Sequence, residues 1–130
     1  MTIPFWCLAI AFLLVYAVKI PVAIAMFKVG GGKYDNDHPR DQQAKLQGWG
    51  RRANAAHQNA FEGFAPFAAA VFVAHLGGGS PHTASLLAIA YVSARFVYNG
   101  LYIGNISTLR SAVWGIGFAS TLGLFLLPVL

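Results

Sequence analysis

Four charged residues stand alone within long apolar stretches of the chain, and their chemistry is the first thing to explain. They are Lys19, Glu62, Arg95 and Arg110. A charged side chain at the centre of a bilayer costs at least about 2.5–3.5 kcal/mol, so residues of this kind usually face a protein interior or a ligand. The side chain of Glu62 is too short to reach the membrane surface, which favours an ion pair or a functional role over a neutral one.

Further polar residues lie on the same helix face as Glu62. They belong to the segment 53–76 and to the arginine just before it. At about 100° per residue in a helix, Arg52, Asn59 and Glu62 fall within about one quarter of the circumference. Arginine pairs bidentately with carboxylates, an amide makes directional hydrogen bonds, and a glutamate can take an ammonium. This polar stripe therefore suits a small ligand that carries both carboxylates and an ammonium.

A second polar face lies on the segment 83–103. Arg95, Tyr98, Asn99 and Tyr102 occur at i, i+3, i+4 and i+7, which places them on one side of a helix. Snorkelling, or an ion pair with the glutamate of the stripe, explains Arg95 almost as well as a ligand does.

Two further cations belong to the first and last apolar segments. Lys19 lies inside the first one, shortly before Pro21, and structural and functional roles are equally expected for it. Arg110 and Ser111 open the last one. If these polar groups converge in the same half of a membrane, they line a cavity that is rich in cations, amides and phenols.

Composition indicates which elements position these residues. The chain has 130 residues, of which 57% are hydrophobic and only 10% are charged, whereas soluble domains average about 45–50% and about 25%. This excludes a disordered chain, a coiled coil and a typical soluble enzyme. Four apolar segments of about 20–25 residues each match a hydrocarbon core of about 30 Å. We therefore predict an all-α, integral membrane four-helix bundle in a single domain, residues 1–130, with helices at about 3–27, 53–76, 83–103 and 111–130.

The distribution of charge predicts an orientation. The segment 28–52 holds six basic and three acidic residues, and the connection 104–110 ends in one arginine. Because basic loops stay in the cytoplasm, we expect both connections there and both termini outside, in a multi-pass protein of a bacterial inner membrane. The net charge of +5 then indicates a lipid bilayer as the partner and no nucleic acid. The first apolar run has no basic leader and no small-residue cleavage site, so we expect it to be retained.

Metal chemistry is not expected. Cys7 is the single cysteine, which excludes an internal disulfide and a multi-cysteine metal site. Acidic residues at 35, 37 and 41 lack the glycine and distal glutamate of a calcium loop, so a solvated turn is the better interpretation.

The two polar faces resemble signatures of the MAPEG family (membrane-associated proteins in eicosanoid and glutathione metabolism). The second-helix signature is matched by Ala56-His57-Gln58-Asn59-Ala60-Phe61-Glu62, followed by Ala65-Pro66-Phe67. The distal signature is matched by Arg95-x-x-Tyr98-x-x-x-Tyr102, followed by Arg110-Ser111. Lys19 is similar too. The resemblance covers nearly the whole chain. The protein looks like a prokaryotic-type member of the family that is similar to microsomal glutathione transferases.

The resemblance implies a homotrimer that binds glutathione as a co-substrate between subunits. By matching position, Asn59 and Glu62 would hold the γ-glutamyl end, and Tyr98 and Tyr102 would line the peptide. Arg110 would stabilise the thiolate, with the serine at 111 beside it. The predicted glutathione site is completed by Lys19, Arg52 and Arg95. A thiolate held in this way would attack a lipophilic electrophile or reduce a lipid peroxide.

One position departs from the family pattern. Glutathione-using members carry an arginine directly before the Ala-His pair, whereas this chain has Ala55. Either Arg52, one turn earlier on the same stripe, substitutes for it, or the carboxylate clamp is degraded. Two alternatives therefore stay open beside the transferase or peroxidase: a non-catalytic protein of the same fold that binds a lipid or a partner, and a small proton-coupled exporter that uses Glu62.

Overall fold

The fold consists of helices joined by short turns and one long connection. The computed structural model describes residues 1–130 and contains no strand. Proline and glycine mark several of the boundaries: Pro81 opens one helix behind the capping hydroxyl of Ser80, which accepts from the Thr83 N–H, and Gly78, at φ 76°, follows another. The elements are α1 Ile3–Ala17, α2 Lys19–Val29, α3 Pro39–Ala44, α4 Gly48–Leu76, α5 Pro81–Ile103, α6 Ser107–Leu126 and a final 3-10 turn, Leu127–Val129.

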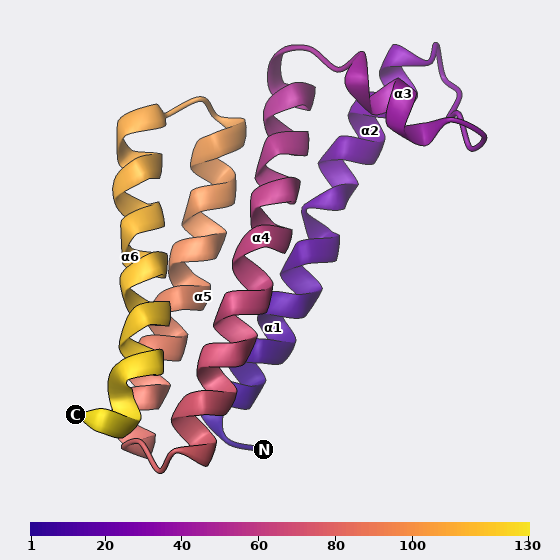
Figure 1. Cartoon of the computed structure of the whole chain (residues 1–130). Helices are drawn as coiled ribbons and strands as arrows, with labels where there is room; N and C mark the ends of the chain where they lie inside the picture. Colours follow the sequence, from indigo (N-terminus) through magenta and orange to yellow (C-terminus); the bar gives the residue numbers. More distant parts are fainter.

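Four helical spans are long and apolar enough to cross a membrane: Ile3–Val29, Gly48–Leu76, Pro81–Ile103 and Ser107–Val129. They stand side by side, with both termini at one end of the bundle and α3 at the other (Figure 1). Large apolar side chains such as Trp6, Phe72 and Phe118 are exposed on the outside. A surface of this kind is unfavourable in water. The chain is therefore an all-α, multi-pass membrane protein in a lipid bilayer.

The helix α4 and the helix α5 form the centre of the bundle. α1 packs against both of them, and α6 packs against the same two. The core consists largely of small side chains, which let the helices approach closely, and within it the ring of Phe67 stacks on Tyr91 at 3.8 Å between centroids. These contacts fix the register of α4 against α5, and this register positions the polar residues.

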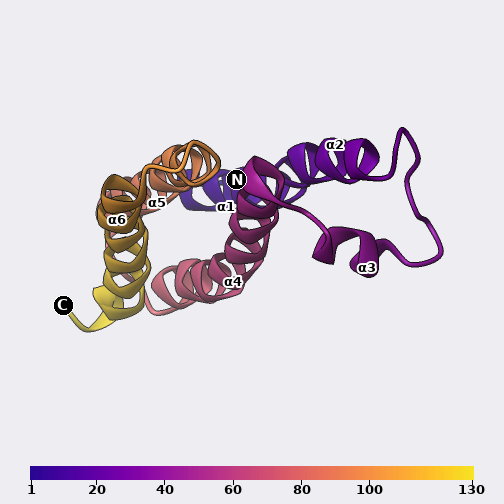
Figure 2. The same cartoon turned by 90° about the horizontal axis from the view of Figure 1, so that it is seen from above.

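The first membrane span is broken at Val18. Pro21 lacks an N–H, and its ring clashes with the carbonyl four residues earlier, that of Ala17, so the helix is interrupted there. Seen from above, α2 and α3 extend away from the other helices (Figure 2). α2 packs against α4 through a separate small core that includes Val22, Met26 and Ala53.

The sequence-based boundaries differ from the observed ones at the polar end. The second span begins at Gly48, not near residue 53, and the last begins at Ser107, not at 111. The connection 28–52 shrinks to residues 30–47 and contains α3, whose Gln42 is buried and donates to the Lys33 carbonyl at 2.9 Å. An apolar run indicates where a helix lies inside the membrane. It does not indicate where the helix begins, because a helix can extend through polar residues beyond the membrane.

Candidate functional site

The predicted polar stripe lies along one continuous helix, α4, and two clefts open beside it. Arg52 and Ala55 line the cleft nearer to α3, and Asn59 and Glu62 line the deeper one. Pro66 also lines the deeper cleft, and because it has no N–H, it leaves the Glu62 carbonyl without its usual helical donor. We call these the outer cleft and the inner cleft.

The inner cleft has a volume of about 320 Å³ and lies between α4, α5 and α6. Polar groups come from α4 and α5, whereas α6 contributes mostly aromatic and aliphatic side chains. A cleft with this division suits a ligand with a polar part and an apolar part. It is lined by Asn59, Glu62, Gly63, Pro66, Tyr91, Arg95, Trp114, Gly117, Phe118, Thr121, Leu122 and Phe125.

The guanidinium of Arg95 is held by Asn59 and forms no ion pair. Arg95 is only 5% exposed, and its Nη2 donates to the Asn59 carbonyl at 3.1 Å and also to the Asn59 Oδ1. The amide nitrogen of Asn59 in turn donates to the Glu62 Oε2 at 3.4 Å. The expected alternatives for Arg95, snorkelling and an ion pair with Glu62, are both absent, because the side chain is buried and Asn59 stands between the two charges.

Two arginines and two tyrosines form a ladder along α5 and into α6. The Arg95 guanidinium lies 4.5 Å from the Tyr98 ring centroid, the rings of Tyr98 and Tyr102 meet edge to face at 5.7 Å, and the Arg110 guanidinium lies 4.3 Å from the Tyr102 ring. Cation–π contacts of this kind hold a guanidinium without neutralising it. The ladder therefore connects the inner cleft, through Arg95, to the outer cleft, through Tyr102.

The outer cleft has a volume of about 350 Å³ and contains two arginines and no acidic residue. The Arg52 Nε donates to the Ile103 carbonyl at 3.0 Å, which ties the start of α4 to the end of α5. Asn105 is the only non-glycine residue at positive φ, at 62°, in the turn between α5 and α6. The lining residues are Gln47, Gly48, Arg51, Arg52, Ala55, Tyr102 and Asn105.

Seven of the nine predicted site residues are brought together by these contacts, and two are not. Lys19 begins α2, which lies apart from α6, and it lines neither cleft. Ser111 donates its hydroxyl to the Ser107 carbonyl at 3.1 Å, one turn back in α6, and it is exposed. Because α6 starts at Ser107, Arg110 and Ser111 lie within its first turns and not ahead of it.

Sequence reasoning missed several residues that line the clefts. Tyr91 donates its hydroxyl to the Gly63 carbonyl at 2.8 Å, where α4 and α5 approach closely. Its position four residues before Arg95 puts it on the same helix face, and this spacing could have identified it. Arg51 and Asn105 fall in the expected connections 28–52 and 104–110, and only the packing of α4 against the α5–α6 turn brings them to the outer cleft.

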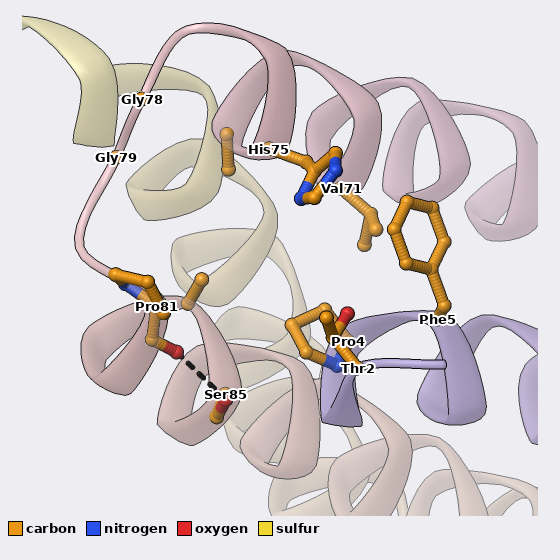
Figure 3. A pocket seen from close by; sticks show the side chains of 11 residues that line it. Thr2, Pro4, Phe5, Val71, His75, Gly78, Gly79, Pro81 and Ser85 are labelled. Carbon is orange, nitrogen blue, oxygen red and sulfur yellow. Dashed lines mark hydrogen bonds between the residues drawn. The ribbon is translucent and has the colours of Figure 1, made fainter.

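A third pocket, of about 310 Å³, lies at the opposite end of the bundle, where the termini are (Figure 1), and Figure 3 shows its lining side chains from close by. Its walls come from the start of α1, the end of α4 and the start of α5. Phe5 and Val71 are apolar, and the polar groups are the side chains of Thr2, His75 and Ser85, of which Ser85 donates to the Pro81 carbonyl. It contains no acidic residue, lysine or arginine, so it offers less chemistry than the two clefts on α4.

The protein is a multi-pass membrane protein with four helical spans. The two clefts and the arginine–tyrosine ladder form a cation-rich polar site near one end of the bundle. The family model of the MAPEG family matches residues 3–130. The chain belongs to the MAPEG family. No curated protein and no solved structure shows significant similarity to it.

Proposed function

We propose that this MAPEG protein is a membrane-bound glutathione-dependent transferase or peroxidase that acts on lipophilic electrophiles or lipid peroxides. The observation that carries the proposal is the arrangement of Arg95, Tyr98, Tyr102 and Arg110 beside Asn59 and Glu62. The ladder offers a guanidinium that no carboxylate neutralises, at Arg110, against the ring of Tyr102, which lines the outer cleft.

Each residue of the stripe would bind a different part of glutathione. Glu62 would take the ammonium of the γ-glutamyl group with its carboxylate and with its backbone carbonyl, which lacks a helical donor because of Pro66. Asn59 would add directional hydrogen bonds. Arg52 would take the carboxylate that a family arginine at position 55 takes elsewhere, because its Nη groups have no partner. Tyr98 and Tyr102 would line the peptide. Lys19, which lies outside both clefts, can contribute only from another subunit.

The chemistry requires a thiolate at Arg110. A free thiol has a pKa of about 8.5, and an adjacent guanidinium lowers it. The S–H bond breaks, its proton leaves to water, and the sulfur forms a bond to an electrophilic carbon while the leaving group departs with its electron pair. With a peroxide, the thiolate takes the outer oxygen and releases an alcohol. A second glutathione then converts the resulting sulfenic acid into a disulfide and water.

A second copy of the chain would complete the site. Glu62 is exposed in the single chain although it lies in the middle of a membrane span, and contact with lipid would be costly there. We propose the homotrimer expected for the family, in which a neighbouring subunit covers this face. We also propose a single domain, the segment 28–52 with its six basic residues in the cytoplasm, the termini outside and a location in a bacterial inner membrane.

A non-catalytic role is the second candidate, and Ala55 is the observation that favours it. Without an arginine there, the carboxylate site depends on residues in the first turns of α4. A protein of the same fold with this change would bind a lipid or a protein partner in the inner cleft instead of glutathione.

Conjugation kinetics test the proposal. Purified protein in neutral detergent should conjugate glutathione to a lipophilic aryl halide, and Arg110→Ala should lower the rate by at least about 100-fold, as expected when one oxyanion-stabilising group is removed. Arg40→Ala, which removes an exposed arginine of α3 away from both clefts, is the matched control. A wild-type rate equal to that without protein would support the non-catalytic role.

A further inference from the structure

The outer cleft combines more positive charge than a single carboxylate needs. Arg51 and Arg52 line it, and Arg110 adds a third guanidinium behind the Tyr102 ring. The nearest acidic residue along α4 is Glu62, seven positions beyond Ala55, or about 10 Å at 1.5 Å per residue. None of the three guanidinium groups has a carboxylate within ion-pairing distance, because the only such contact in the chain joins His38 to Asp35.

The hydrogen-bonding capacity of these arginines is also largely unused. Arg52 spends its Nε on the Ile103 carbonyl, which fixes the guanidinium in place and leaves its four Nη protons without a protein acceptor. The Arg51 side chain makes no hydrogen bond within the chain and is exposed. A guanidinium fixed through Nε keeps its planar fork for a bidentate partner.

The start of α4 adds backbone N–H donors, which attract negative charge as the arginines do. Gln47 occupies the N-cap position without making a side-chain cap, and the first turn contains no acidic residue. The first N–H groups of a helix have no helical partner, and together with the helix dipole they favour an anion. Gln47 and Gly48 both line the outer cleft, so these donors border the same space as the two arginines.

Ala55 provides the room. It lines the cleft with a single methyl group, whereas a long side chain there would extend into the space between Arg52 and Tyr102. The small side chain of Ala55 therefore leaves this space open to a ligand, while the positive groups lie one helical turn nearer the helix start, at Arg51 and Arg52.

We infer that the outer cleft holds the tail of the thiol co-substrate and selects a tail with two negative charges over one with a single charge. This inference rests on the proposed function, because it assumes that the thiol lies at Arg110. The fixed guanidinium of Arg52, the free guanidinium of Arg51 and the helix N–H groups together can bind two carboxylates, or one doubly charged group. A single glycine carboxylate leaves one of the two arginines without a partner.

Three synthetic thiols that differ only in the tail give the test. They are γ-glutamylcysteinylglycinamide, glutathione and γ-glutamylcysteinylaspartate, whose tails carry zero, one and two negative charges. Dissociation constants are measured by calorimetry in neutral detergent at one pH and one salt concentration. We expect affinity to rise about tenfold at each step, as charge-assisted hydrogen bonds are added. Equal affinities for glutathione and the aspartyl peptide would overturn the inference.

Variants locate the effect. Arg51→Ala should abolish the advantage of the aspartyl peptide while glutathione binding changes little, and Arg40→Ala should leave all three affinities unchanged. Ala55→Leu fills the cleft without removing a charge, and it should also abolish the advantage of the aspartyl peptide. Helix content and elution volume confirm folding for each variant. Full retention of the advantage in both Arg51→Ala and Ala55→Leu would overturn the inference.

Two further measurements distinguish a failure of this inference from a failure of the proposed function, and a thiol tail from a lipid headgroup as the occupant. The ultraviolet band of the bound thiolate reports the proposed function by itself, so a band without tail selectivity overturns only the inference, whereas tail selectivity without a band overturns the thiolate chemistry and with it the assignment of the tail to a co-substrate. Repeating the titrations in nanodiscs of phosphatidylcholine or phosphatidylglycerol tests a lipid headgroup as the occupant. Loss of tail selectivity in phosphatidylglycerol alone would assign the cleft to the lipid phosphate and overturn the inference.

Discussion

The inner and outer clefts lie on the same face of α4, and they treat positive charge in opposite ways. In the inner cleft, Arg95 is buried and its guanidinium is satisfied by the Asn59 carbonyl and side chain. In the outer cleft, Arg51 and Arg52 keep most of their donors free. Burial explains the difference, because an unsatisfied charge is far more costly in a low-dielectric interior than at a boundary that water reaches. The inner arginine therefore serves the structure first, and the outer arginines are free for a ligand.

The largest effect that this comparison predicts is on stability. Asn59→Leu should lower the free energy of unfolding by about 3 kcal/mol, because it leaves the buried Arg95 guanidinium with one backbone acceptor. Arg52→Leu, in the outer cleft, should cost less than about 1 kcal/mol, the value of a single typical hydrogen bond. Unfolding in mixed micelles measures both. Equal losses for the two variants would remove the distinction between the clefts.

The close approach of α4 and α5 at the inner cleft predicts the next effect. A Cβ at position 63 would lie 2.9 Å from the Tyr91 hydroxyl, so Gly63→Ala should cost about 1–3 kcal/mol as an overpacked contact. Gly115→Ala is the matched control, because a Cβ there meets nothing within 4 Å. The control should be neutral or slightly stabilising, since alanine favours helix. Comparable melting temperatures for the two variants would contradict the packing described here.

A smaller effect is expected where the ladder joins the two clefts. Tyr102→Leu removes the ring that lies under Arg110 and should cost about 0.5–1 kcal/mol of stability. Tyr102→Phe keeps the ring and should be nearly neutral. The difference between these two variants isolates the cation–π contact. A loss in Tyr102→Phe as large as in Tyr102→Leu would mean that the hydroxyl, and not the ring face, is what matters.

The smallest stability change is expected at Glu62. Glu62→Gln keeps an oxygen that can accept from the Asn59 amide, so the free energy of unfolding should change by less than about 0.5 kcal/mol. The affinity for glutathione should nevertheless fall about tenfold, because the amide cannot pair with an ammonium. The exporter hypothesis makes the opposite prediction: a drug-resistance phenotype that depends on Glu62 and not on Arg110. Finding that phenotype would overturn the thiol site.

The periodic features of the site could be read from the sequence, and the contacts between helices could not. The spacing of Asn59 and Glu62 on α4, and of Arg95, Tyr98 and Tyr102 on α5, follows from helix geometry alone, and four apolar runs sufficed to predict the membrane bundle. That Arg95 meets Asn59, and not Glu62, depends on the register between α4 and α5.

The ends of the helices were the least predictable part. Pro21 carried a signal for the break at Val18, because proline removes a helical hydrogen bond, but the direction in which α2 leaves the bundle depends on its packing against α4. The outer cleft went unrecognised for the same reason. Its residues come from two helix ends and a turn, and apolar patterns carry no information about where polar helix ends lie.

The ultraviolet difference spectrum of glutathione bound to the purified protein, titrated with pH, shows whether Arg110 stabilises a thiolate. We expect a thiolate band at neutral pH in the wild type, well below the free thiol pKa of about 8.5. In Arg110→Ala the band should appear only near the pH at which free glutathione ionises. A wild-type protein that shows no thiolate band at millimolar glutathione, or an Arg110→Ala protein that shows the same band as the wild type, would contradict this role of Arg110.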